Sequence, residues 1–315
     1  MGAERPDGIL LGLDLGGTQV KAARFSPSGE REAVARVDSP SHESPEAVLG
    51  AVLAALRALL PGGASPAGVG IGVAGVLDLK EGRIIESPNL PVLSGFPLRE
   101  RLQSALGGAP LRLLNDANAA ALGEFHAGAG RPFESMVLLT LGTGIGGAIV
   151  LGGKLWEGAA GIAGEAGHMC VQAGGPECTC GARGCLEACV SGWALTRDAR
   201  AAAARNPASA IASLAEITPK RLADLALGGD AEARALWERA GEMLGTGIAS
   251  LMNLLNPEAI VLAGGLVQAG DLLLGPARRA WERQAFERAR ASAQVLPAAL
   301  GEWAGVRGAV QPFLS

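Results

Sequence analysis

The chain has 315 residues, 49% of them hydrophobic, and a formal net charge of −4 with acidic and basic side chains interspersed. This length is sufficient for one large domain or two ordinary domains with a substantial core. The balanced charge provides no electrostatic footprint for nucleic acid or an anionic membrane, so neither is expected as a partner.

No charged region followed by an apolar stretch precedes Ile9, so no secretory signal is expected. The uncharged window 135–153 contains six glycines and is typical of strand, turn and strand rather than of a membrane span. We therefore predict a soluble cytoplasmic protein, in which cysteines remain free to bind metal.

The first half is predicted to alternate strands and helices. Apolar runs bounded by turn residues predict strands at 9–15, 20–25, 33–37, 68–77 and 111–114. Ser44 and Pro45 predict the start of a helix that continues to Leu60, and a short helix is expected at 98–106. Asn115 and Asp116 follow the last strand, just before an alanine-rich helix.

The second half repeats this plan. Residues 136–147 again predict a strand and a glycine turn, followed by a hairpin partner at 148–151, which suggests an internal duplication with two phosphate-binding turns facing a shared cleft. Helices are expected at 193–205, 231–255 and 271–290, and a strand at 259–262 leads into a third glycine turn. Alternating strands and helices predict an α/β protein with mainly parallel sheets.

The glycine turns are candidate phosphate sites, because backbone N–H groups can approach an anion where no side chain intervenes. None of the turns matches the Walker or the Rossmann pattern. Asp14 is placed to hold Mg²⁺ through water, and Lys21 is placed to neutralise phosphate; the alternative for Asp14 is a turn-forming aspartate.

Asp116 is the candidate general base, since it lies at the carboxyl end of a predicted strand, where α/β sheets bind ligands. Asn115 or Asp116 can also cap the following helix. Asn89, between two prolines, can donate to and accept from a sugar hydroxyl.

Residues 164–187 carry a predicted zinc site. Cys178, Cys180 and Cys185 form a C-x-C-x4-C array, and His168 lies ten residues upstream. A closed Cys3His set is typical of structural zinc. The alternative is a chance cluster of buried thiols, and Cys170 and Cys189 remain possible competing ligands.

Two glutamates, Glu165 and Glu187, flank the predicted metal ligands. A rigid metal loop would hold both carboxylates in place, and His168 could bind zinc through one ring nitrogen while the other hydrogen-bonds a polar group. Fixed acceptors of this kind suit a polyhydroxylated ligand; the alternative is that each glutamate is a solvated surface charge.

In this order, the segments DLGGTQVK, SPNLP, LNDANAAALGE, LGTGIGG, GEAGH, CTCGARGCLE and AGG resemble the ROK family of repressors, open reading frames and kinases, and most closely its glucokinase branch. The resemblance spans nearly the whole chain. It implies an actin-like ATPase fold with two ribonuclease-H-like α/β domains around a central cleft. The implied domains are 1–114, with 298–315 returning to it, and 115–297, which carries the zinc loop.

The resemblance also implies roles for individual residues. Asp116 would be the catalytic base, and the sugar would be held by Asn89, Asn115, Asp116, Glu165, His168 and Glu187. ATP would be bound by Asp14, Gly16, Gly17, Thr18, Gln19, Lys21, Gly142, Thr143, Gly144, Gly146, Gly147, Gly264 and Gly265. Cys170 and Cys189 are not part of the matched motif.

The implied activity is Mg²⁺-dependent phosphorylation of glucose at its 6-hydroxyl by ATP, in a homodimer or homotetramer. The acceptor could instead be fructose, mannose, N-acetylglucosamine or N-acetylmannosamine, and polyphosphate could replace ATP. A sugar-sensing regulator is a further alternative, but no amino-terminal DNA-binding module is expected because the first strand begins by Ile9.

Overall fold

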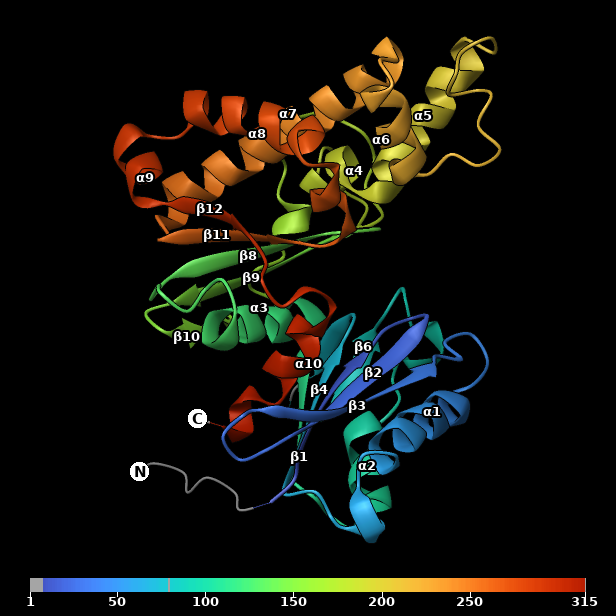
Figure 1. The fold of residues 1–315 in the computed structure, drawn as a ribbon, viewed down its shortest axis with the longest axis vertical. Coiled ribbons are helices and arrows are strands. Elements are labelled where there is room, and N and C mark those ends of the chain that lie inside the picture. The colour runs from blue at the N-terminus through green and yellow to red at the C-terminus, as the bar shows by residue number, and fades with distance from the viewer. Residues whose placement is uncertain (1–7, 79, 315) are drawn as a thin grey trace. The chain divides into compact units, whose positions relative to one another are not determined.

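The computed structural model describes residues 8–78 and 80–314. Two five-stranded sheets organise the chain (Figure 1). Packing divides the described residues into two compact units. Unit 1 is drawn from Met1–Pro132, Leu155–Ala163 and Ala299–Ser315, and unit 2 from Phe133–Lys154 and Gly164–Ala298.

The sheet of unit 1 has the strand order β3-β2-β1-β4-β7. Its strands are β1 (Leu10–Leu15), β2 (Gln19–Phe25), β3 (Arg31–Asp38), β4 (Gly68–Val73) and β7 (Leu111–Asn115). β1 is antiparallel to β2 and parallel to β4, which is parallel to β7. The carboxyl ends of β1, β4 and β7 therefore lie along one edge, which is where Asp14 and Asp116 are found.

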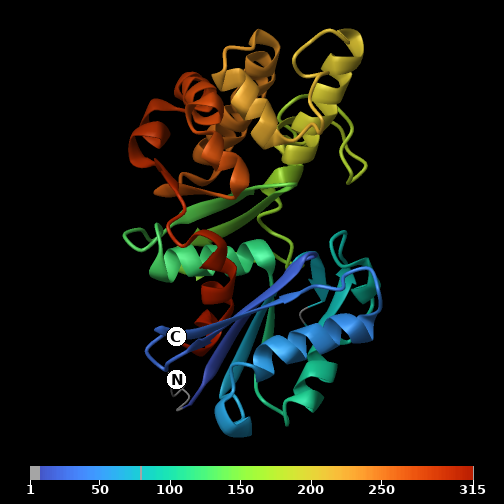
Figure 2. The ribbon, with the colours of Figure 1, turned by 45° about the vertical axis from the view of Figure 1, so that its right-hand side comes forward.

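Helices cover both faces of this sheet (Figures 1 and 2). α1 (Pro45–Arg57) and α2 (Leu98–Ala105) lie on one face, and α3 (Asp116–Ala127) and α10 (Ala304–Ala309) lie on the other. Smaller elements of the unit are β5 (Val76–Asp78), β6 (Arg83–Glu86), η1 (Pro61–Gly63), η2 (Pro91–Leu93), η5 (Gly301–Trp303) and η6 (Gln311–Phe313).

The sheet of unit 2 has the order β10-β9-β8-β11-β12. β8 is antiparallel to β9 and parallel to β11, which is parallel to β12. The strands are β8 (Met136–Leu141), β9 (Ile145–Leu151), β10 (Lys154–Leu155), β11 (Ala259–Ala263) and β12 (Gln294–Pro297). This arrangement repeats that of unit 1, as the predicted duplication requires.

The helices of unit 2 enclose a second hydrophobic core, in which Trp237 is 1% exposed. They are η3 (Ala166–His168), α4 (Leu186–Val190), α5 (Gly192–Arg205), α6 (Pro219–Leu227), α7 (Ala231–Leu255), η4 (Gly265–Ala269), α8 (Asp271–Gln284) and α9 (Glu287–Ser292). None of the helices in the described ranges combines the length and the hydropathy that a bilayer crossing requires.

Three predicted elements are wrong in extent. The helix predicted to continue to Leu60 ends at Arg57. The strand predicted at 68–77 is broken by Gly75, whose φ of +124° ends β4 before the separate strand β5. The helix predicted at 271–290 ends at Gln284, because Ala285 is extended and the Phe286 amide donates 2.8 Å to Asn253 Oδ1. Packing groups α3 with unit 1, but packing does not decide where a domain boundary falls, so the predicted boundary after residue 114 stays a prediction.

Candidate active site

The turn between β1 and β2 forms the first part of the site. Gly16 N donates to Gln19 O at 3.1 Å and closes the turn directly after Asp14 and Leu15. A Cβ on Gly17 would lie 2.7 Å from the carbonyl oxygen of Asn89. Only glycine therefore lets the Asn89 loop pack against this turn.

Asn115 and Asp116 sit where β7 passes into α3. The Asn115 Oδ1 accepts from Ala117 N at 2.9 Å and Asn118 N at 3.1 Å, so Asn115 is the helix N-cap that the sequence offered as an alternative. Its Nδ2 also donates to Gly75 O at 3.2 Å. Asp116 Oδ1 accepts from Ala117 N at 2.9 Å, which orients the carboxylate.

The two carboxylates of this site are poorly solvated and repel each other. Burial raises the pKa of Asp14 to about 6, with a further increase from the charge of Asp116 and a decrease from Lys21. Burial also raises the pKa of Asp116, opposed by the hydrogen bond from Ala117 N. A base whose pKa lies nearer to neutrality is better matched to taking a proton at physiological pH.

Lys21 is part of an ion-pair cluster on unit 1. Its Nζ lies 3.4 Å from a Glu302 carboxylate oxygen, and Glu302 also pairs with Arg36. Arg36 Nη1 in turn donates to Gln19 Oε1 at 3.4 Å. Two of the predicted ATP-binding side chains, Gln19 and Lys21, are thus held by partners within the unit.

At the glycine turns of unit 2, a side-chain oxygen and a backbone carbonyl leave no room for a Cβ. A Cβ on Gly144 would lie 2.5 Å from Glu187 Oε2, and the same oxygen accepts from Ile145 N at 2.8 Å. At the third turn, Gly264 has a φ of +95° and its Cβ would lie 2.3 Å from Leu141 O. Gly146 and Gly147 lie in β9.

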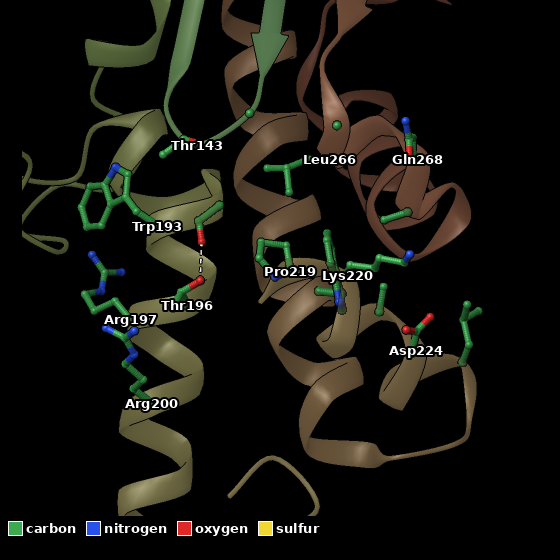
Figure 3. Close-up of a pocket in the computed structure, with 17 residues that line it drawn as sticks. Thr143, Trp193, Thr196, Arg197, Arg200, Pro219, Lys220, Asp224, Leu266 and Gln268 are labelled. Atoms are coloured by element: carbon green, nitrogen blue, oxygen red, sulfur yellow. Dashed lines mark hydrogen bonds between the residues drawn. The ribbon is translucent and has the colours of Figure 1, made fainter. Parts of the chain in front are cut away.

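A cavity of about 1120 Å³ lies beside these turns (Figure 3). α5 begins against the first of them, since Gly192 N donates to Gly142 O at 2.9 Å. The predicted residues Gly142, Thr143 and Gly265 line one part of the cavity, and α5, α6, α7 and η4 supply the rest: Gly192, Trp193, Thr196, Arg197, Arg200, Pro219, Lys220, Ala223, Asp224, Leu227, Trp237, Leu266, Gln268 and Ala269.

Sequence reasoning missed these additional lining residues. Helix α6 was not predicted at all, although Thr218 caps it and Pro219 opens it, which are the usual signals of a helix start.

The lining of the cavity suits a nucleotide. The apolar parts of Pro219, Ala223 and Leu266 suit a flat aromatic base, and the glycine turns offer backbone N–H groups to phosphates.

The four predicted zinc ligands come together. One ligand atom each from His168, Cys178, Cys180 and Cys185 lie within 4.8 Å of one another. The Cys178 sulfur is 3.6 Å from His168 Nδ1, and the Cys180 and Cys185 sulfurs are 3.7 Å apart. These spacings fit tetrahedral zinc, for which ligand distances of about 2.0–2.3 Å place neighbouring ligands roughly 3.5–4 Å apart.

The loop around these four residues depends on glycine. Gly181 and Gly184 have φ values of +87° and +72°, and a Cβ on Gly184 would lie 1.8 Å from Gln172 O. Cys170 and Cys189 stay outside the four-ligand cluster.

The carboxylates that flank the cluster differ in their contacts. A Glu165 oxygen lies 4.0 Å from His168 Nε2, the ring nitrogen turned away from Cys178. Glu187 bonds to Ile145 N, and its other oxygen accepts from Thr179 Oγ1 at 3.4 Å. The predicted sugar-binding residues are divided between the units: Asn89, Asn115 and Asp116 belong to unit 1, and Glu165, His168 and Glu187 belong to unit 2.

Known proteins resemble this chain in both sequence and fold. A glucokinase of Thermotoga maritima is 36% identical over 95% of each chain. The crystal structure of a ROK hexokinase from Thermus thermophilus is 37% identical, with a TM-score of 0.82 over 96% of each chain. A ROK glucokinase from Streptomyces griseus, solved with glucose and AMPPNP, is 34% identical, with a TM-score of 0.80 over 97% of this chain and 99% of that one.

These likenesses define the class as an α/β protein with the actin-like ATPase fold, which confirms the predicted fold class. The ROK family model matches residues 10–314, and the chain belongs to the ROK family.

Proposed function

We propose that this protein is a glucokinase, an enzyme that transfers the γ-phosphoryl group of ATP to the 6-hydroxyl of D-glucose. The observation that carries the proposal is the cavity bounded by Gly142, Thr143 and Gly265, which has room for a nucleotide, in a chain 36% identical to a glucokinase over 95% of its length. The half-buried carboxylate of Asp116, at the start of α3, supplies the base that such a transfer needs.

In this mechanism the residues of the chain mainly position the reactants. Asp116 accepts the proton of the sugar 6-hydroxyl while the hydroxyl oxygen attacks the γ-phosphorus of ATP. The bond between that phosphorus and the oxygen that bridges it to ADP breaks. The sugar is held by Asn89, Asn115, Glu165, His168 and Glu187, together with Asp116. The first glycine turn, with Lys21, and the turns of unit 2 hold the phosphates of ATP.

Two metal ions belong to the proposal. Asp14 would hold Mg²⁺ through water, and this ion would neutralise charge on the phosphates. Zinc bound by His168, Cys178, Cys180 and Cys185 would be structural, since all four ligands come from protein. We also expect a cytoplasmic homodimer or homotetramer.

The test is a coupled assay of ADP release with Mg²⁺ and either ATP or polyphosphate, against glucose, fructose, mannose, N-acetylglucosamine and N-acetylmannosamine. We expect ATP and glucose to give the highest kcat/KM. Turnover only with an acetamido sugar would replace glucose as the acceptor, and no turnover with any sugar would favour a sugar-sensing regulator.

The variant Asp116→Asn tests the proposed base. It keeps the size of the side chain but cannot accept the proton, so we expect kcat to fall at least ~10³-fold while glucose still binds in a calorimetric titration. Asp38→Asn, on the exposed edge of β3, is the matched control and should retain wild-type kcat. A near-normal rate for Asp116→Asn would refute the assignment.

A further inference from the structure

Glu124 is a fully buried carboxylate with no part in the mechanism above. It is 0% exposed, and it accepts three backbone hydrogen bonds. Its Oε2 accepts from Ala129 N at 2.8 Å and Ala299 N at 3.0 Å, and its Oε1 accepts from Leu300 N at 2.7 Å. A buried carboxylate is tolerated only with such partners, so this side chain ties the end of α3 to the segment that leads into α10.

α3 and α10 touch through their backbones. A Cβ on Gly123 would lie 2.2 Å from Ala304 O, and a Cβ on Gly308 would lie 1.6 Å from Ala119 O. No side chain separates the two helices at these points. Because the backbones are in direct contact, α10 cannot slide along α3. A displacement of α10 is therefore passed on to α3.

These helices also contact both carboxylates of the candidate active site. Asp116 is the first residue of α3. On α10, the Cβ position of Gly305 is 3.5 Å from Asp14 Cγ, and a Cβ on Gly12, two residues before Asp14, would lie 2.2 Å from Val306 O. The position of α10 therefore fixes α3 relative to the end of β1.

We propose that Glu124 is a positioning residue for Asp116. By holding the segment at Ala299 and Leu300, it sets the register of α10 against α3 and so the place of Asp116 relative to Asp14. The effect on turnover rests on the proposed glucokinase activity, whereas the effect on the first turn of α3 does not.

The test variant is Glu124→Gln. The amide keeps the size of the side chain but replaces one acceptor oxygen by an NH₂ group, so it cannot accept all three bonds. We expect kcat to fall at least tenfold, with KM for glucose and ATP changed less than twofold. Hydrogen exchange should quicken at Ala299 and Leu300, and also at Ala117 and Asn118, about two turns away along α3.

The control is a core variant on the opposite face of the sheet, Val52→Ala in α1 or Leu102→Ala in α2, chosen to match the loss in Tm. It should keep wild-type kcat at a temperature where all variants are folded. If Glu124→Gln fails to fold, Glu124→Asp keeps the charge on a shorter side chain and should give the same pattern more weakly.

The outcomes separate the two proposals. A kcat for the Glu124 variant equal to that of the matched control, or unchanged exchange at Ala117 and Asn118, would overturn the positioning role. Absence of wild-type turnover on every sugar would overturn only the proposed function, and faster exchange at the first turn of α3 would still support the positioning of Asp116 by Glu124.

Discussion

At the scale of single residues, the candidate active site combines two carboxylates that both lose hydration on folding. Asp14 lies near the end of the apolar strand β1, and Asp116 opens α3, so each side chain is carried into the protein by the element it belongs to. Burial is the main reason that the pKa of each is raised. Burying two neighbouring carboxylates lowers the stability of the fold, a cost that is common at functional sites.

The raised pKa of Asp14 predicts a pH-dependent loss of stability. The pKa of Asp14 rises from 3.8 to about 6 on folding, so between these pH values the folded chain binds more protons than the unfolded chain. The contribution of Asp14 to the free energy of unfolding therefore falls as the pH rises from about 4 to about 6. Asp14→Asn removes the charge. It should raise the free energy of unfolding by on the order of 1–2 kcal/mol at pH 7.5, and much less at pH 4.

Urea unfolding without Mg²⁺ at the two pH values measures this difference, with Asp38→Asn as the exposed control. The Asp14 variant should also lose its turnover, since the residue is proposed to hold Mg²⁺. An equal change in stability at pH 4 and pH 7.5 would contradict the titration of Asp14.

At the scale of elements, the proposed zinc loop connects the Cys3His cluster to the candidate sugar-binding residues. His168 ends η3 and Cys185 caps α4, so the four ligands connect two short helices. Glu187 lies in the first turn of α4 and accepts from Ile145 N at the start of β9, directly after the hairpin turn. The loop therefore braces the glycine turn beside the cavity.

Removal of the metal should loosen this brace. We expect about one zinc per chain by elemental analysis, and chelation or Cys185→Ser should lower Tm by roughly 10 °C or more, since the metal contributes folding energy. Cys170→Ser, outside the cluster, should keep both zinc and Tm. A chain that is free of metal yet equally stable and active would show that the loop does not need zinc.

At the scale of the whole molecule, there are two sheets of repeated topology, and each packs with its helices around a separate hydrophobic core. The cavity beside the glycine turns of β8 and β11 lies entirely in unit 2, whereas Asp14 and Asp116 belong to unit 1. The proposed ATP contacts around the cavity can therefore form without the residues of unit 1.

This division predicts where ATP protects the chain. With a non-hydrolysable ATP analogue and no sugar, hydrogen exchange should slow in α6, at Thr143 and in η4, because a ligand stabilises the elements that bind it. α2, in unit 1, serves as the internal control and should exchange as in the free protein. Protection from exchange that is confined to unit 1 would contradict nucleotide binding in the cavity.

Much of the fold could be predicted because its signals are local. Apolar runs ending in glycine turns marked β1, β8 and β11, and an apolar run marked β4. Asp230 and Asn256 bound the predicted helix α7 as N-cap and left-handed C-cap. The break at Gly75 could not be predicted, since its positive φ follows from the approach of β6. Helix α6 was missed although Thr218 and Pro219 mark its start, and the similarly short helix α2 was predicted.

The sequence by itself determined the α/β class, the duplication and the four residues of the Cys3His cluster, because strand period, turn glycines and cysteine spacing depend on neighbours along the chain. Only the tertiary structure decided which distant groups meet. The cavity lining from α5, α6 and η4, the pairing of Lys21 with Glu302 and the hydrogen bonds from Ala299 and Leu300 to Glu124 depend on contacts between segments far apart in the sequence. Such contacts leave no periodic pattern, since they are fixed by how helices and sheets pack.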